Sequence, residues 1–226
     1  MAFSILSQMP AERRSVDSIG ITRNAKGKWI ASGSGEFADL AVDDKATRIS
    51  FTHTAASLPW VVPSQAFSTD EKWVQEPQAP IGYELTKAGH KLSNERLKVS
   101  GLAPGNYQIS IDGKPTGEPV SHLRLATKIE LQSNSATPQY QQSLEVAHLN
   151  RERNDLAIRP LRGVWGQIKG LRRKLAESDP QAFGVEYAKR QPRIEELLAL
   201  AAEYDEKIHA AAQPKAREYV IERVKQ

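Results

Sequence analysis

The chain contains no cysteine among its 226 residues. It can therefore form no disulfide, thiolate nucleophile or zinc–thiolate site, and this absence is compatible with an oxidising or a reducing compartment. The sequence also lacks an apolar run of about 18 residues, the length that suggests a membrane span. Residues 1–9 lack the basic leader and small-residue cleavage site of a signal peptide. We expect no membrane-spanning segment, while the localisation stays open.

Motifs that define several enzyme classes are missing as well. The sequence has no phosphate-binding glycine loop, no dinucleotide fingerprint and no zinc-ligand spacing, so it predicts no cofactor and no metal. Hydrophobic residues make up 39% and charged residues 26% of the chain, and the net charge is +4. This balance is typical of a globular protein and not of a disordered one.

Between residues 16 and 112, apolar and polar residues alternate with the period of half-buried strands. Gly, Asn and Asp residues separate the runs and favour tight turns. The sequence therefore predicts an antiparallel, sandwich-like β domain over residues 16–120. Within it, residues 58–88 carry four prolines that disfavour a central strand or a long helix, so a long packed loop is expected there.

After Ala136 the period becomes that of a helix, and residues 121–226 are predicted to form a helical region. Thr137 and Pro138 are typical of an N-cap and a first helical turn. Pro160 must end or kink the first helix. A short segment and a further helix follow, which gives a long kinked helix and a helical hairpin. The fold class is therefore α+β.

The two ends of the sequence carry separate expectations. Residues 1–15 are predicted to form an apolar helix that has no N-cap and remains from a preceding core. We therefore expect the chain to be a fragment of a longer polypeptide. Residues 219–224 are apolar enough to add a terminal strand.

Residues 97–114 carry the most specific pattern: a strand, Gly-Leu, a loop, Gly-x-Tyr, a second strand and Ile-Asp-Gly. This segment resembles the C-terminal region of the SGNH (GDSL-type) hydrolases of planctomycete-like bacteria. Other segments look like parts of the same region in the same order, namely residues 38–42, 57–59, 94–97, 137–138 and 211–217.

The resemblance implies that the catalytic blocks precede this region. In that family the nucleophile lies in a Gly-Asp-Ser block, a Gly and an Asn complete the oxyanion hole, and the acid and base lie in an Asp-x-x-His-Pro block. None of these blocks occurs in this sequence. Acyl transfer by serine needs a hydroxyl activated by an oriented imidazole. We therefore predict no catalytic, cofactor-binding or metal-binding residue.

Each histidine also has a plain structural interpretation. His53 is in phase with Ile49 and Phe51, which predicts a hydrogen-bonded packing histidine and not a base. His90 and His122 lie in polar connections, and we assign no role to either.

Two Glu-x-x-His pairs, Glu145 with His148 and Glu206 with His209, have the spacing of ligands in di-iron helical bundles. The second pair lies near a helix end, and a bundle of four long helices does not fit beside so large a β half. The sequence therefore does not predict a metal site at these pairs.

Basic residues outnumber acidic ones between Arg151 and Lys174. Such a stretch can follow a phosphate backbone, but the apolar residues between the charges form a core stripe. The stretch is therefore read as a solvated helix face, and nucleic acid is not an expected partner. Three glycines at residues 163, 166 and 170 weaken the helix but permit close packing.

Two functions remain open. The first is the accessory portion of an SGNH/GDSL-type ester hydrolase, which packs against a catalytic core absent from this chain and is inactive alone. The resemblance leaves export of the parent protein open. The second is a stand-alone binding module for a protein or an anionic polymer.

Overall fold

The structure, a computed structural model, describes residues 15–61 and 78–224. The predicted helix at residues 1–15 therefore lies almost wholly outside the described residues. The chain divides into two compact units, which are described separately. The first unit comprises Met1–Leu144 and Ala212–Gln226, and the second comprises Glu145–Ala211. The α+β fold class is confirmed, although this division differs from the predicted boundary at residue 120, since the last strand belongs with the first unit.

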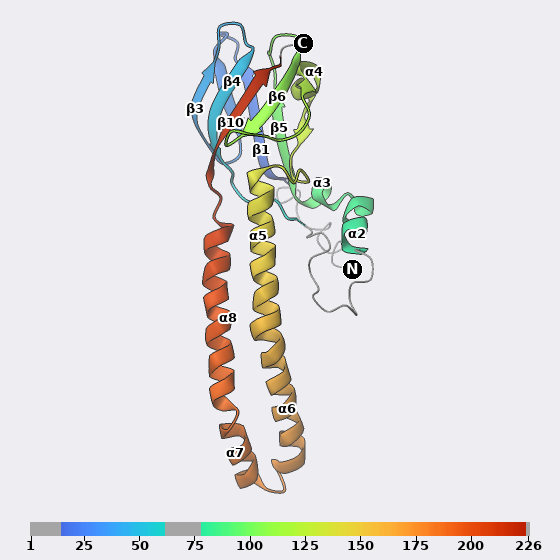
Figure 1. Ribbon diagram of the computed structural model, residues 1–226, viewed down its shortest axis with the longest axis vertical. Helices are drawn as coiled ribbons and strands as arrows, with labels where there is room; N and C mark the ends of the chain where they lie inside the picture. Colours follow the sequence, from blue (N-terminus) through green and yellow to red (C-terminus); the bar gives the residue numbers. More distant parts are fainter. Residues whose placement is uncertain (1–14, 62–77, 225–226) are drawn as a thin grey trace. The chain divides into compact units, whose positions relative to one another are not determined.

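Two sheets build the first unit (Figure 1). The first sheet has the strand order β2 (Trp29–Gly33), β1 (Ser15–Arg23), β5 (Asn94–Val99) and β9 (Ile129–Glu130). The second has the order β3 (Glu36–Val42), β4 (Arg48–Thr54), β10 (Ala216–Arg223), β6 (Asn106–Ile111) and β7 (Lys114–Pro115), with β8 (Val120–Ser121) also on β6.

The last strand, β10, confirms the predicted terminal strand and holds a central place in the second sheet. It pairs antiparallel with β4 on one edge and β6 on the other (Figure 1). In this register Ile221 is opposite both Ile49 and Ile109. Three neighbouring strands thus present apolar side chains at one level of the sheet.

One strand pair differs from the antiparallel prediction. β1 and β5 run parallel, with Ile19 opposite Leu97 and Ile21 opposite Val99. A parallel pair needs a long crossover connection, and here β2, β3, β4 and residues 55–93 supply it. Alternation along a strand is the same in both directions, so it could not reveal this pairing.

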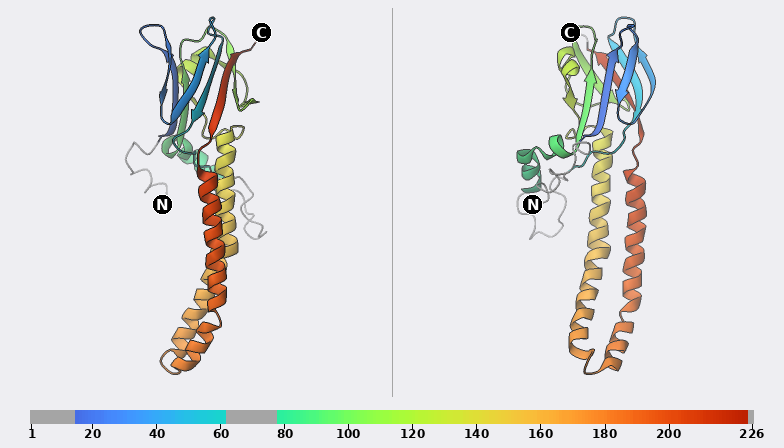
Figure 2. Two further views of the ribbon diagram at one scale, coloured as in Figure 1. Left: turned by 90° about the vertical axis from the view of Figure 1, so that its left-hand side faces the viewer. Right: turned by 180° about the vertical axis from the view of Figure 1, so that it is seen from behind.

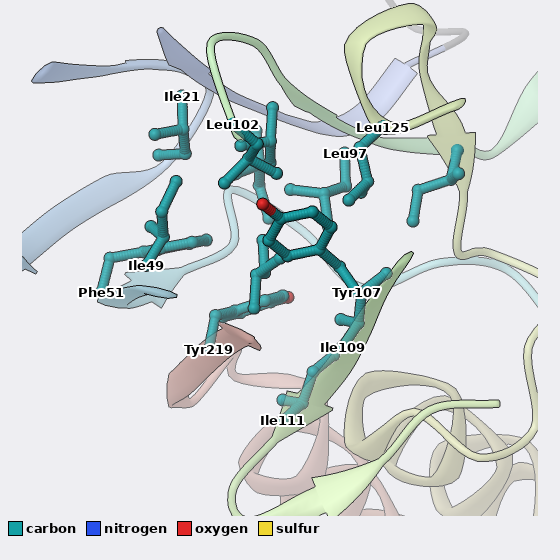
Figure 3. Close-up of a cluster of buried hydrophobic side chains, with 14 of the residues drawn as sticks. Ile21, Ile49, Phe51, Leu97, Leu102, Tyr107, Ile109, Ile111, Leu125 and Tyr219 are labelled. Carbon is teal, nitrogen blue, oxygen red and sulfur yellow. The ribbon is translucent and has the colours of Figure 1, made fainter. Parts of the chain in front are cut away.

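Side chains from both sheets share one apolar core. Tyr107 on β6 is completely buried, and Figure 3 shows its ring among the side chains of Leu97, Leu102 and Ile109. The ring of Phe51 stacks on that of Tyr219 with the centroids 4.9 Å apart. The Tyr107 hydroxyl lies 2.6 Å from the carbonyl oxygen of Ala103 and 3.2 Å from that of Ala46, so its polar tip is satisfied inside the core.

The predicted loop at residues 58–88 is wrong in its second half. Residues 62–77 lie outside the described part of the chain, but α2 (Gln78–Thr86) follows them, and then α3 (Ala88–Leu92). Pro80 falls in the first turn of α2, where backbone N–H groups have no helical partner and proline is tolerated. A further short helix, α4 (His122–Thr127), begins at the Ser121 cap.

The helical prediction is confirmed in its main features. α5 (Pro138–Arg153) runs through a π-helical turn, η3 (Asn154–Ile158), into α6 (Arg159–Leu175). The irregular turn ends two residues before Pro160, which disrupts regular helical hydrogen bonding. α7 (Pro180–Ala188) and α8 (Gln191–Ala212) complete the region. No helix among residues 15–61 and 78–224 has the length and apolar character to cross a membrane.

The second unit is an antiparallel helical hairpin, visible in both views of Figure 2. Its buried seam comprises Ala157, Ile168, Ile194, Leu197, Ala201 and Tyr204. Arg153 Nε and Asp205 Oδ1 join its two arms at 2.7 Å. The seam is narrow, since two helices can cover each other on one side only.

We expect Tyr107→Phe to lower the free energy of unfolding of the first unit by about 1 kcal/mol, because it removes a buried hydroxyl and strands its carbonyl partners. Tyr107→Ala should cost about 3–5 kcal/mol because it also leaves a cavity. Urea unfolding followed by tryptophan fluorescence measures both. Equal stability of Tyr107→Phe and the unaltered chain would contradict the assigned hydrogen bonds.

Candidate functional site

A buried imidazole joins the two sheets. His53 on β4 is 1% exposed, and its Nε2 lies 2.7 Å from Oδ2 of Asp17 on β1, which is also 1% exposed. Its Nδ1 lies 3.0 Å from the carbonyl oxygen of Glu36 on β3. A carbonyl oxygen can only accept, so Nδ1 carries a hydrogen and donates it. The contact between Nε2 and Asp17 then requires one shared proton, on the imidazole or on the carboxyl group.

A serine completes this cluster from the turn between β2 and β3. The Ser34 hydroxyl donates to Asp17 Oδ1 at 2.8 Å and accepts from the Ser18 N–H at 2.7 Å. Gly33 and Gly35 flank it with φ values of 139° and 74°. A Cβ at Gly35 would collide with the Thr54 carbonyl and the His53 ring. The two glycines therefore let the chain turn tightly enough to bring Ser34 onto Asp17.

Ser34, Asp17 and His53 do not form a catalytic triad, although they are the three residue types of one. In a triad the imidazole lies between the serine and the carboxylate, and one ring nitrogen takes the serine proton. Here the carboxylate lies in the middle, and both nitrogens of His53 are engaged by Asp17 and Glu36. The imidazole cannot deprotonate Ser34 in this arrangement. His53 is a hydrogen-bonded packing histidine, as its place in the strand predicts.

Glu95 on β5 extends the polar cluster. Burial raises the pKa of its carboxyl group from 4.5 to about 7, the Asp17 charge adds to the rise, and the Gln139 hydrogen bond and His53 oppose it. The Gln139 amide donates to Glu95 Oε1 at 2.7 Å and to the Tyr219 hydroxyl at 2.6 Å. Burial likewise raises the pKa of Tyr219 well above its ordinary value.

Solvent and substrate have little access to this cluster. A depression lined by His53, Gln139, Arg217 and Tyr219 has a volume of about 10 Å³, which is the space of roughly one water molecule. A perturbed carboxyl group in a cleft would be a candidate acid or base, but Glu95 has no room for a substrate beside it. We assign the cluster to the connection between the sheets.

An open cleft of about 440 Å³ lies elsewhere in the first unit, between α2, α3 and the residues around β9. Its lining includes Tyr83, Glu84, Lys87, His90, Glu130 and Gln132. This volume is within the range of small-molecule sites.

His90 and Glu130 give the cleft an oriented imidazole. His90 Nδ1 lies 2.7 Å from Glu130 Oε1, and the Gln132 amide donates to Glu130 Oε2 at 2.8 Å. Burial raises the pKa of the Glu130 carboxyl group, but hydrogen bonds from Gln132 and His90 outweigh it and leave the pKa lowered. A carboxylate held in this way fixes the direction of its histidine, and the His90 side chain is half exposed. The arrangement can bind a small polar ligand.

Among the described residues that line the cleft, none is placed as an activated nucleophile. Ser133 contributes to its lining, but its side chain hydrogen-bonds to Tyr83. His122, the remaining histidine of the first unit, accepts from the Gly105 N–H through Nδ1 at 3.2 Å. The prediction that this chain supplies no catalytic residue stays a prediction.

The charged residues of the hairpin form mostly local pairs. Arg151 and Arg159 both pair with Asp155, and Arg153 pairs with Asp205. Glu145 and His148 lie on α5, while Glu206 and His209 lie on α8. Within residues 15–61 and 78–224, no group of three or more potential His, Asp or Glu ligands is placed to hold a metal ion.

The sequence could not reveal either polar site. Asp17 precedes His53 by 36 positions and Glu130 follows His90 by 40, so neither pair forms a local motif. The Gly-Ser-Gly segment that places Ser34 predicts a tight turn but not the partner of its hydroxyl.

No protein-family model and no curated protein matches the chain. Among solved structures, it is similar to BT4096, described as a gut microbial diltiazem-metabolizing enzyme, with 26% sequence identity and a TM-score of 0.65. The similarity covers 93% of this chain but 50% of that chain. This protein therefore spans about half the length of that enzyme.

We expect His53→Ala to destabilise the first unit by about 3 kcal/mol or more, because it leaves the buried Asp17 group without its partner. Adding Asp17→Asn to the same chain should recover part of that loss, since a neutral amide replaces the carboxyl group that has lost its imidazole partner. Ser34→Ala should cost only about 1–2 kcal/mol. Chemical denaturation of the four proteins measures these values, and a double variant no more stable than His53→Ala would contradict the paired assignment.

The raised pKa of Glu95 predicts a pH-dependent stability. The folded state holds this proton more tightly than the unfolded state, so the stabilisation is complete below about pH 4.5 and is lost as the pH rises through about 7. The shift corresponds to a loss of about 3 kcal/mol. Glu95→Gln, which stays neutral, should therefore be more stable than the unaltered chain at pH 8 and similar at pH 5. Thermal unfolding at both pH values tests this, and an equal effect at both would contradict it.

Proposed function

We propose that this chain is the accessory portion of an SGNH/GDSL-type ester hydrolase and works with a catalytic core that it does not itself contain. The observation that carries the proposal is the similarity to BT4096, which covers nearly all of this chain and half of an enzyme. The resemblance of residues 97–114 to the C-terminal region of the SGNH hydrolases supports it independently. The diltiazem-metabolizing activity itself belongs to BT4096 and identifies no substrate here.

The polar geometry of the first unit agrees with this role. Ser34 donates its hydrogen bond to a carboxylate instead of a free imidazole nitrogen, so no imidazole is placed to activate it. The cleft beside His90 and Glu130 is open and polar. On this proposal it is the part of the accessory domain suited to line a substrate site whose nucleophile comes from the catalytic core.

We expect the purified chain to hydrolyse a small acetyl ester such as p-nitrophenyl acetate no faster than a heat-denatured sample or a Ser34→Ala variant. The physical reason is the lack of an activated hydroxyl. Turnover above background that disappears in Ser34→Ala or His90→Ala would overturn the proposed inactivity and would identify the residue responsible.

The accessory role needs its own experiment. The gene and its neighbours are searched for Gly-Asp-Ser and Asp-x-x-His-Pro blocks, and the encoded core is assayed with and without this chain. A change in kcat or KM on addition of the chain supports the role. A core that neither binds the chain nor changes its kinetics contradicts it.

A stand-alone binding module is the second candidate, and one observation favours it. Within the hairpin, which the structure describes completely, five basic residues of α6 take part in no ion pair, namely Arg162, Lys169, Arg172, Arg173 and Lys174. These cations are available to an acidic partner. An anionic polymer would bind them with a strong dependence on salt.

A further inference from the structure

The helical hairpin exposes four large apolar side chains, Leu156, Trp165, Val185 and Leu198, and two of them have equivalent positions beside its seam. Trp165 on α6 is 46% exposed and Leu198 on α8 is 51% exposed. Each precedes a buried seam residue by three positions, Ile168 and Ala201 respectively. Residues three apart are neighbours on a helix surface, so both side chains lie at the border of the seam.

Trp165 and Leu198 lie on the same side of the hairpin. A right-handed helix turns by about 100° per residue, so each residue is displaced from its seam in the same rotational sense. The two helices run in opposite directions and face each other through their seams. A rotation of the same sense and size away from the two seams therefore brings Trp165 and Leu198 to the same side of the helix pair. The angular positions that follow from 100° per residue place further residues on this side. We define the Trp165 face as Arg162, Trp165 and Lys169 on α6 with Glu195, Leu198 and Glu206 on α8.

The charges of this face are divided between its two helices. α6 carries basic residues and no acidic one, and the face takes Arg162 and Lys169 from it. The α8 side contributes Glu195 and Glu206. In the hairpin as described, Glu195 accepts a hydrogen bond from Gln191 but meets no cation. One half of the face is therefore positive and the other half negative.

A surface divided in this way is complementary to itself. A two-fold axis parallel to the helices places α6 of one copy against α8 of the other, whereas a perpendicular axis places basic α6 against basic α6. Arg153 and Asp205 form an ion pair and so lie at the same height along the hairpin. Arg162 and Glu195 are each about the same number of residues nearer the turn, so they also lie at a similar height. Opposite charges would then meet at the same height in the parallel arrangement.

We propose that the Trp165 face binds the same face of a second copy of this chain, forming an antiparallel four-helix bundle. In this dimer Arg162 pairs with Glu195 of the second copy, and the second copy covers the exposed side chains of Trp165 and Leu198. Tryptophan and arginine are common anchors of protein interfaces, and one self-complementary patch is what a two-fold dimer requires. The inference is independent of the proposed hydrolase role.

Sedimentation of the full chain between about 1 and 100 μM tests the proposal, since modest interfaces dissociate in this range. We expect a concentration-dependent dimer that weakens at high salt. Arg162→Glu and Glu195→Arg should each weaken it at least about fivefold, and the two substitutions together should restore it, because the opposite charges then meet in reversed order. Lys174→Glu makes the same change of charge on the other side of α6 and should have little effect.

Cross-linking gives a second measurement that does not depend on affinity. The chain has no native cysteine, so R162C and E195C chains carry one thiol each, and Cα atoms within about 7 Å can form a disulfide. Mixed and oxidised, the two variants should yield a cross-linked heterodimer, while R162C alone should not. Far-UV circular dichroism confirms that each hairpin is folded.

Three outcomes overturn the proposal: a monomer at every concentration, a dimer that the charge reversal does not restore, or cross-linking of R162C with itself in preference to E195C. A chain that stays monomeric but is retained by heparin at low salt would show instead that the face binds an anionic polymer.

Discussion

The buried bond between His53 and Asp17 is the polar connection on which the first unit depends. It links β4 of one sheet to β1 of the other at 2.7 Å, and Ser34 and Glu36 hold its two ends in place. A charge or an unpaired imidazole at this depth would be costly. The apolar core can therefore close only when the strands are registered so that these groups meet. Glu95, Gln139 and Tyr219 continue the same network toward α5 and β10.

This network also explains why Ser, His and Asp side chains meet without producing an esterase-like site. Catalysis by a serine triad requires an imidazole with one nitrogen free to take a proton, whereas a buried imidazole is stable when both of its ring nitrogens have partners. His53 satisfies the second condition and so fails the first. The histidine of the open cleft differs from His53 in its exposure. His90 is half exposed, and Glu130 orients its ring.

The strands and helices could be predicted from the sequence because their signals are local. The alternation through Ile49, Phe51 and His53 marks a buried strand face, and Asp179 with Pro180 marks the start of α7, where the aspartate carboxylate accepts from the Ala182 N–H. Pairing could not be predicted in the same way. The parallel contact of β1 with β5 and the partners of His53 and His90 join residues far apart in the chain, which no local pattern records. The sequence does not predict α2 because proline usually breaks a helix, but Pro80 lies in the first turn of α2, where proline is tolerated.

The central position of β10 has a consequence for how the first unit is made. Ribosomes synthesise β4 and β6 long before β10, with the whole hairpin in between. Until those last strand residues leave the exit tunnel, β4 and β6 each present an unpaired edge, and such edges invite misassembly. Completion of the second sheet therefore has to wait until the hairpin, residues 145–211, and then β10 have been synthesised.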